Sequence, residues 1–395
     1  MIDKQRAKSS LRYVEDVAPG LKLDMTLNAI LHTSVSDVQS VQVIDTFFGK
    51  TLVTDGKTQS SAYDEAVYHE SLVHPALFTC AVRNRRDNDR HGHPKTVLIG
   101  GGGELATARE ALRHNSITSV TMVDIDPCVV QVCKTYLPEW GGDAVLRHPK
   151  LRYVVGDARE YVRGTTETYD VIIMDVSDPI EYGPAEALYN VEFYTLVKSK
   201  LNVGGVFVTQ AGSAGYVQVE QQQEDDEEEE EGSCLAPIRN TLAHVFDVAL
   251  VYTAPVASFG EDWGFVLAYD DNTSANDTNN NNNCDDVTAM IDELIEQRIV
   301  SVPGVPEHDA INKARTTRMR RRMKNNGGSK NNNNSALTNG NDGTLAPIQL
   351  LMGKEVLRHY DSTAHIRMFA LNKSLRIALE EDTRIMTEEN PIYMY

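Results

Sequence analysis

The sequence contains no run of eighteen consecutive apolar residues, and residues 1–10 are too polar for the core of a secretory signal. We therefore expect a cytoplasmic protein with no membrane partner. Cysteine is scarce, because the chain has five cysteines and none of them forms a C-x-x-C pair. No histidine stands at a metal-ligand spacing from them, so buried or incidental thiols in a reducing compartment are favoured over a metal site.

Basic residues are outnumbered: 38 lysines and arginines stand against 57 aspartates and glutamates, which gives a formal net charge of −19. A surface of this sign repels nucleic acid, so no nucleic-acid partner is expected. The basic cluster at residues 315–324 is the exception. A nucleic-acid contact or a nuclear address is the alternative there to a solvated linker, which we favour.

The chain does contain enough apolar sequence for a large core, with 395 residues of which 41% are hydrophobic. Residues 1–61 are rich in β-branched side chains, and the segment 47–54, closed by Asp55 and Gly56, is typical of a hairpin. We predict a small N-terminal β-rich domain over residues 1–61 and a larger α/β domain over residues 62–395.

Two low-complexity insertions are predicted inside the larger domain, at about 221–233 and 271–345. The first holds eight consecutive acids at 224–231, and the second holds two asparagine-rich tracts. A helical segment near 287–298 interrupts the second insertion. Further helices are predicted at 63–78, with Pro75 near its end, and at 371–379; residues 83–93 read as a polar linker.

Residues 97–126 have the pattern of a βαβ unit. A strand, a glycine turn, a helix and a second strand are predicted at 97–99, 100–103, 105–114 and 120–123. Gly101, Gly103 and Ala106 match G-x-G-x-x-A, a pattern that is weak by itself. In this context the glycines let the backbone approach a ligand, and Asp124 can accept hydrogen bonds from both hydroxyls of a ribose. A nucleoside site is predicted.

Strands and helices alternate from residue 96 onward, as a mostly parallel sheet requires. The seven predicted strands are 97–99, 120–123, 152–155, 171–174, 206–209, 248–252 and 265–268. Three of them are followed by an aspartate, at Asp124, Asp157 and Asp175, and a fourth by the glycine turn. Because a ligand of such a sheet binds beyond the carboxyl ends of the strands, we expect these groups to line one cleft.

The charge of the expected ligand follows from Glu104, which lies inside the glycine turn. A pyrophosphate would need backbone N–H groups there, and a carboxylate would repel it. Several acids around one cleft repel each other unless the occupant is a cation. An adenosine that carries a sulfonium fits both requirements better than a dinucleotide does.

Asp175 and Asp178 lie three residues apart directly after a predicted strand. They suit a general base and a binding partner for an ammonium group, with Tyr68 as a further partner. A turn or a helix cap is the structural alternative. A metal pair is disfavoured, because no further ligand residues stand near them in the sequence. An amine that loses its proton to Asp175 would attack the carbon next to the sulfonium.

Several stretches resemble the spermidine and spermine synthase family, the polyamine aminopropyltransferases. They are FGKTLVTDGKTQ, DEAVYHESLVHPAL, TVLIGGGGELATARE, VDIDPCVV, GDARE, IIMDVSDP and GPAEALY. The resemblance implies a methyltransferase-like Rossmann domain behind the N-terminal β domain, and homodimers or homotetramers. It also implies decarboxylated S-adenosylmethionine as a co-substrate, with no cofactor and no metal.

The resemblance also assigns roles to residues at the matching motif positions. Asp175 would be the base, and Tyr68 and Asp178 would bind the acceptor. Contacts to the donor are implied for Gln39, Gln59, His69, Glu104, Asp124 and Asp157. Ala158 is a further predicted substrate-binding residue, and Gly101 and Gly103 are predicted to bind through the glycine turn.

Departures from the spermidine synthase pattern concern the acceptor. Glu104 is followed by Leu105 and Ala106 where spermidine synthases usually have GGGDGG, and a two-residue extension at Glu181 and Tyr182 resembles thermospermine synthases. We therefore expect spermidine as the acceptor, with Glu181 and Trp263 among its contacts. The alternatives to thermospermine synthesis are spermidine or spermine synthesis, a methyltransferase and a non-catalytic polyamine-binding subunit.

Overall fold

The computed structural model describes six parts of the chain, residues 11–18, 21–85, 93–214, 233–271, 284–305 and 356–394. The predicted acidic run, both asparagine-rich tracts and the basic cluster lie outside these residues. Within them, no helix is both long and apolar enough to cross a membrane.

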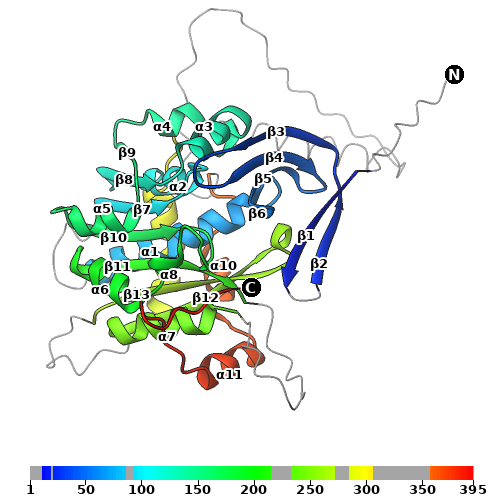
Figure 1. Ribbon diagram of the computed structural model, residues 1–395. Helices are drawn as coiled ribbons and strands as arrows, with labels where there is room; N and C mark the ends of the chain where they lie inside the picture. The colour runs from blue at the N-terminus through cyan, green and yellow to red at the C-terminus, as the bar shows by residue number, and fades with distance from the viewer. Residues whose placement is uncertain are drawn as a thin grey trace, which may run out of the picture.

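The centre of the molecule is a seven-stranded sheet in the order β12-β13-β11-β10-β7-β8-β9 (Figure 1). All seven predicted strands are present, and only β13 runs against its neighbours. Their bounds are β7 Thr96–Gly101, β8 Ser119–Asp124, β9 Leu151–Val155, β10 Tyr169–Asp175, β11 Leu201–Ser213, β12 Val248–Val256 and β13 Glu261–Tyr269. The predicted mostly parallel α/β fold is confirmed.

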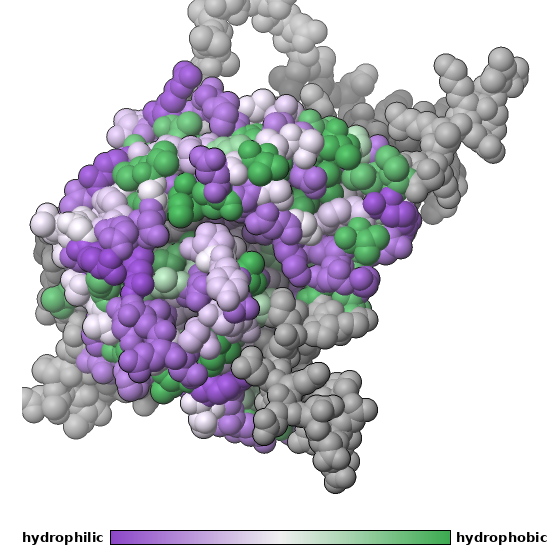
Figure 2. All heavy atoms as spheres, in the orientation of Figure 1, coloured by the Kyte–Doolittle hydropathy of each residue, from purple (hydrophilic) through white to green (hydrophobic). Residues whose placement is uncertain are grey.

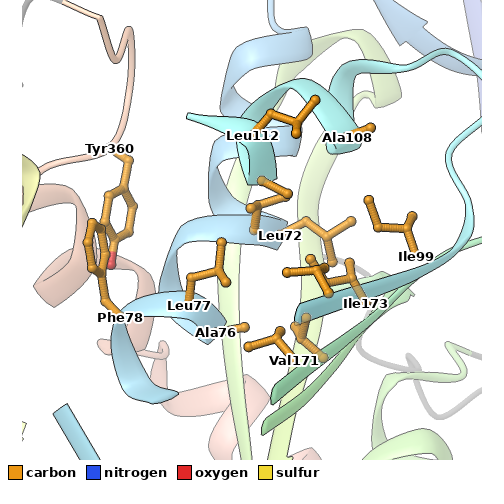
Figure 3. Packing of buried hydrophobic residues seen from close by; sticks show 14 of the residues in the cluster. Leu72, Ala76, Leu77, Phe78, Ile99, Ala108, Leu112, Val171, Ile173 and Tyr360 are labelled. Atoms are coloured by element: carbon orange, nitrogen blue, oxygen red, sulfur yellow. The ribbon is translucent and has the colours of Figure 1, made fainter. Parts of the chain in front are cut away.

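Helices cover both faces of this sheet. On one face, α1, α2, α8 and α10 pack over a core in which Leu72 of α1 points toward Ile99 and Ile173 of the sheet (Figure 3). The opposite face is covered mainly by α5, α6, α7 and α11. The bounds are α1 Glu65–Arg85, α2 Ala106–Leu112, α3 Pro127–Tyr136, α4 Gly142–Leu146, α5 Ala158–Gly164, α6 Val191–Ser199, α7 Leu235–Val245, α8 Cys284–Arg298, α10 Ser362–Phe369 and α11 Lys373–Glu381. The described residues also include three short 3-10 helices, η1 Pro138–Trp140, η2 Glu186–Leu188 and η3 Ala257–Phe259.

Helix α1 continues well past Pro75, which the sequence had placed near the end of a shorter helix. It runs to Arg85 and so takes in the start of the predicted linker. Proline has no N–H to donate to the carbonyl four residues earlier, here that of Ser71. The hydroxyl of Tyr252 in β12 donates to this carbonyl at 3.0 Å. The helix therefore tolerates the proline because a neighbouring strand supplies the missing donor.

Helix α2 begins at Ala106, one residue later than predicted. Leu105 has φ 74°, a left-handed conformation that lies outside helical geometry. The predicted helix at 371–379 is found as α11, whose first turn is capped by Asn372 accepting from the N–H of Leu375. Helix α10, capped in the same way by Asp361, was not predicted.

Two small antiparallel sheets precede the central one. Strands β1 (Arg12–Ala18) and β2 (Leu21–Thr26) form a ribbon, and β3 (Ala29–Val35), β4 (Ser40–Thr46), β5 (Gly49–Thr54) and β6 (Lys57–Ser61) form a four-stranded meander. The predicted hairpin is the β4-β5 pair, with Asp55 and Gly56 in the turn that follows it.

The segment after the second insertion is held against α1 by a buried carboxylate. Glu70 accepts hydrogen bonds of 2.8 Å from the backbone N–H groups of Arg358, His359 and Tyr360. The ring of Tyr360 stacks on Phe78, with 5.9 Å between the ring centroids (Figure 3). Residues far apart in the sequence thus form one layer of the fold.

Candidate active site

Two adjoining cavities, of about 130 and about 200 Å³, lie where the carboxyl ends of β7, β8 and β10 meet the N-terminal meander. The order of the sheet reverses between β7 and β10, which is where such sheets leave a crevice. Three predicted residues line both cavities: Gln39, Gln59 and Tyr68.

The structure distributes the other predicted residues between the two cavities. The first is lined by Gly101, Gly103, Glu104, Asp124, Asp157, Ala158 and Asp175. The second is lined by Asp178 and Trp263. His69 and Glu181 line neither cavity, because His69 is buried behind Glu104 and the Glu181 side chain is exposed to solvent.

Asp175 ends β10 and lines the first cavity. Its Oδ1 accepts a hydrogen bond of 2.9 Å from the hydroxyl of Tyr68, and its Oδ2 accepts one from Thr107. The glycine turn packs on the backbone of the same residue: the N–H of Gly102 donates to the Asp175 carbonyl at 2.9 Å. A Cβ on Gly101 would lie 2.0 Å from that carbonyl oxygen, so only glycine fits there. The turn thus fixes the place of the carboxylate.

Asp124 ends β8 and is 9% exposed. Its Oδ1 accepts from the N–H of Asp126 at 2.8 Å, and the N–H of Gly103 also donates to the carboxylate. A Cβ on Gly103 would lie 2.8 Å from Oδ2, which explains the glycine. Burial raises the pKa of Asp124 to about 6, against the opposing effect of these backbone donors. A ligand that donates hydroxyl hydrogen bonds would lower it again.

Glu104 follows the glycine turn and is also 9% exposed. Burial raises its pKa, the nearby His69 opposes this, and the charge of Asp175 adds to it. Nε2 of His69 bonds Oε1 of Glu104, while Nδ1 lies 2.6 Å from the backbone carbonyl of Glu65. The histidine therefore orients Glu104 from behind the cavity wall.

Two possible metal ligands that are distant from Asp175 in the sequence lie beside it in the structure. His69, Glu104 and Asp175 bring one ligand atom each to within 4.8 Å of one another. One imidazole and two carboxylates form a donor set that zinc accepts. The prediction of a metal-free site remains a prediction.

Gln210 of β11 organises the second cavity, and the sequence analysis had not assigned it a role. Its Nε2 donates to Oδ1 of Asp178 at 3.0 Å and to the hydroxyl of Tyr189 at 2.7 Å. Its Oε1 accepts from the indole Nε1 of Trp263 at 3.1 Å. Gln210 is 2% exposed, so one buried amide holds both predicted contacts in place. The only signal for it was its position at the carboxyl end of a predicted strand.

The charge in the second cavity is mostly negative. Burial raises the pKa of Asp178 to about 6, while its bond to Gln210 and the charge of Lys57 lower it. Glu261 also lines this cavity, and its Oε2 accepts from the hydroxyl of Ser213. Carboxylates that face one another in this way suit a cationic occupant.

The remaining predicted contacts lie at the rim of the first cavity. Asp157 is exposed and caps α5, because its Oδ1 accepts from the N–H of Glu160 at 3.0 Å. Nε2 of Gln39 donates to Oδ2 of Asp126 at 3.1 Å, and Nε2 of Gln59 donates to the carbonyl of Lys57 at 3.3 Å. Both glutamines still line the two cavities.

Two family descriptions match the chain. The spermine/spermidine synthase domain matches residues 65–279, and the spermidine synthase tetramerisation domain matches residues 12–61. The first of these alone covers more than half of the chain.

Three curated relatives illustrate the similarity. The thermospermine synthase ACAULIS5 of Arabidopsis thaliana is 40% identical over 260 residues, 65% of this chain and 69% of the relative. A polyamine aminopropyltransferase of Aeropyrum pernix is 46% identical over 56% of this chain, and the match spans 63% of that relative, somewhat under two thirds. One of Sulfolobus acidocaldarius is 31% identical over 93% of this chain and 92% of its own.

Solved structures share the fold. A spermidine synthase in complex with the transition state analogue AdoDATO has a TM-score of 0.66 and 21% identity, covering 96% of this chain and 98% of its own. The spermidine synthase of Thermotoga maritima has a TM-score of 0.63 and 20% identity, with the same coverage.

Proposed function

This chain belongs to the spermine/spermidine synthase family of polyamine aminopropyltransferases, and from that premise we propose that it is a thermospermine synthase. It would transfer an aminopropyl group from decarboxylated S-adenosylmethionine to spermidine and release methylthioadenosine. The observation that carries the proposal is the position of Asp175 in the wall of the first cavity, hydrogen-bonded to Tyr68, which lines both cavities.

The first cavity would hold the donor. In this proposal Asp124 accepts hydrogen bonds from the ribose hydroxyls, and Asp157 with Ala158 lies beside the adenine. Glu104, oriented by His69, would bind the ammonium group of the aminopropyl chain. Gly101 and Gly103 would let the backbone lie close to the nucleoside, while Gln39 and Gln59 close the side toward the meander.

The chemistry needs one proton acceptor. A polyamine nitrogen is protonated at neutral pH and becomes a nucleophile only after it loses a proton, which Asp175 would accept. The freed nitrogen attacks the carbon bonded to the sulfonium, and the electron pair of the C–S bond passes to sulfur. Methylthioadenosine leaves as a neutral thioether, so this departure requires neither an acid catalyst nor a metal. The protein residues supply orientation and charge.

The second cavity would hold the acceptor. Asp178 would bind one ammonium group of spermidine, and Tyr68 would align the attacking nitrogen beside Asp175. Glu261 offers a further carboxylate for a triamine, whereas a diamine has one cationic nitrogen fewer. The exposed Glu181 lines neither cavity, so Glu261 and Trp263 support the choice of spermidine better than Glu181 does.

The oligomeric state and the division of the chain belong to the same proposal. The match of residues 12–61 to a tetramerisation domain supports homodimers or homotetramers formed through an N-terminal domain that ends at residue 61. Phe47 and Val35 in this part are 79% and 82% exposed, and Figure 2 shows hydrophobic residues over the N-terminal strands. Apolar area of this kind is typical of an interface.

The test is a product analysis. Purified protein is incubated with decarboxylated S-adenosylmethionine and either putrescine or spermidine, and the products are separated by chromatography that resolves spermine from thermospermine. Thermospermine from spermidine is the expected product. Spermine, or spermidine from putrescine, would keep the transfer chemistry and overturn the acceptor assignment. A protein that binds polyamines without any transfer would be a non-catalytic subunit, and methyl transfer from S-adenosylmethionine would make it a methyltransferase.

A further inference from the structure

The chain after α11 returns across the molecule to the second cavity. We call residues 386–394 the C-terminal strap. Met386 anchors its start, because its N–H donates to the hydroxyl of Thr241 at 2.9 Å and its carbonyl accepts from Val191 at 3.0 Å. Glu388 adds an ion pair with Arg159. These contacts tie the strap to α5, α6 and α7, and it lies beyond the residues matched by either family description.

The end of the strap holds the loop that carries Asp178. The N–H of Met394 donates to the carbonyl of Pro179 at 2.7 Å, directly after Asp178 in the sequence. The hydroxyl of Tyr393 donates to Oε1 of Glu186 at 2.7 Å, at the other end of the same loop. Two hydrogen bonds therefore fix both ends of the 178–186 loop to the strap.

Met394 is also part of the cavity wall. Its side chain is 9% exposed and lines the second cavity together with Asp178 and Trp263. Opposite it lies Gly212, with φ 77°; a Cβ there would be 2.9 Å from Sδ of Met394 and 3.5 Å from Oδ1 of Asp178. The thioether and the carboxylate thus border the same small space.

This pairing matches the chemistry of a polyamine, in which charged nitrogens alternate with three- or four-carbon methylene segments. Asp178 suits a nitrogen, and the thioether of Met394 and the ring of Trp263 suit the methylenes beside it. A shorter diamine would place fewer methylenes against this wall. The identity of residue 394 therefore bears on how long an acceptor the cavity prefers.

We propose that Met394, held by the strap, is a specificity-determining residue that selects the acceptor by the length of its methylene chain. The inference rests on the proposed function, because it takes the second cavity to be the acceptor site. Tyr393 acts through the 178–186 loop and is a positioning residue.

The experiment compares Met394→Ala, Met394→Leu and wild type with spermidine and putrescine at saturating donor. Met394→Ala is expected to raise the KM for spermidine about tenfold and to reduce the spermidine-to-putrescine ratio of kcat/KM by a similar factor, with the KM of the donor unchanged. Met394→Leu restores most of the apolar volume, so its spermidine KM and its spermidine-to-putrescine ratio are expected to differ from wild type by only about twofold to threefold. Tyr393→Phe is expected to raise the spermidine KM with little change in kcat. Glu389→Ala, an exposed strap position, is the matched control and should behave as wild type.

A binding measurement without donor separates this inference from the proposed function. Trp263 lines the same cavity, so its fluorescence reports spermidine binding in the absence of turnover. If wild-type protein transfers no aminopropyl group to any amine, the proposed function fails. If wild type is active and Met394→Ala keeps both its acceptor ratio and its spermidine affinity, the role of Met394 is refuted. Should Met394→Ala not fold, Met394→Leu and Tyr393→Phe decide, and wild-type values for both refute it equally.

Discussion

The hydroxyl of Tyr68 donates a 2.9 Å hydrogen bond to Oδ1 of Asp175, although 107 residues separate the two in the sequence. Burial, followed by the charge of Asp175, raises the pKa of Tyr68 well above its usual value. The phenol therefore stays protonated and can only donate to this carboxylate. The bond holds the Asp175 carboxylate in a fixed orientation in the wall of the first cavity, next to Tyr68, which lines both cavities.

Asp175→Asn is expected to lower kcat by about 10²- to 10⁴-fold, because the amide keeps the shape and cannot accept the proton of the amine. Binding of methylthioadenosine, measured by calorimetry, should stay within about threefold of wild type. Tyr68→Phe removes only the orienting bond, and we expect a smaller loss of about tenfold in kcat. Unchanged turnover in Asp175→Asn would remove Asp175 from the role of base.

Binding of the donor product is expected to depend on pH through Asp124. A ribose hydroxyl donates to the ionised carboxylate, and the pKa of this group in the free protein is about 6. Affinity for methylthioadenosine should therefore rise as the pH increases from 5 to 7 and then level off. Asp124→Asn should bind more weakly and with a flat profile over this range. A wild-type profile that is flat between pH 5 and 7 would contradict the assignment.

The same shift predicts the direction of the stability change. Since burial raises the folded-state pKa of Asp124 to about 6 from the ordinary aspartate value of 3.8, the folded state binds the proton more tightly than the unfolded state. The contribution of the Asp124 proton to the free energy of unfolding is therefore lost as the pH rises from about 4 to about 6. Thermal unfolding of ligand-free wild type and Asp124→Asn, compared at pH 4.5 and 6.5, measures this difference. The variant should lose less stability over that interval.

Gln210→Leu is expected to raise the KM for the acceptor about tenfold and to leave the KM for the donor unchanged. The substitution removes the hydrogen bonds to Asp178 and Trp263. Because the Gln210 bond lowers the pKa of Asp178, its loss raises that pKa further above 6. The acid limb of kcat/KM for the acceptor should therefore move to higher pH. A loss of activity with an unmoved acid limb would reduce Gln210 to a packing role.

Glu70→Ala is expected to lower the free energy of unfolding by about 2–4 kcal/mol, because three backbone N–H groups lose their acceptor. Urea unfolding gives the magnitude, and limited proteolysis locates the effect near residues 356–360. Glu380→Ala, on the exposed side of α11, is the control and should lie within about 0.5 kcal/mol of wild type. Equal stability of the two variants would contradict the role of Glu70 in holding residues 358–360 against α1.

Chelation is expected to leave kcat and both KM values unchanged, because a neutral thioether leaves without a Lewis acid. Added Zn²⁺ is expected to inhibit, since His69, Glu104 and Asp175 supply three ligand atoms within 4.8 Å. His69→Asn should weaken this inhibition. An enzyme that loses activity in EDTA and regains it with metal would overturn the metal-free mechanism.

Local patterns predicted the sheet well. Each strand carried its own apolar run, and the aspartates at the ends of β8 and β10 followed directly in the sequence. The proximity of these groups in space could also be predicted, because neighbouring parallel strands end at one edge of the sheet. Periodicity and turn residues therefore located the first cavity.

The contacts that link distant segments could not be predicted from local patterns. Gln210 looks like an ordinary strand residue until Asp178 and Trp263 are placed beside it. Met394 lies more than 200 residues beyond the loop it holds, and no local pattern records that contact. Glu181 was chosen because it stood next to a chemical motif, yet it points to solvent. Nearness in sequence proved a poor guide wherever the chain crosses between elements.

The proline in α1 has a consequence for the order in which the chain acquires its structure. The Ser71 carbonyl finds its donor in Tyr252, 181 residues later in the sequence. While the protein is being synthesised, the ribosome completes α1 long before it reaches β12. During that interval the carbonyl depends on water, so the middle of the nascent helix must stay hydrated. The carbonyl exchanges water for a protein donor only when β12 packs against α1. The long helix therefore acquires its last hydrogen bond together with the sheet.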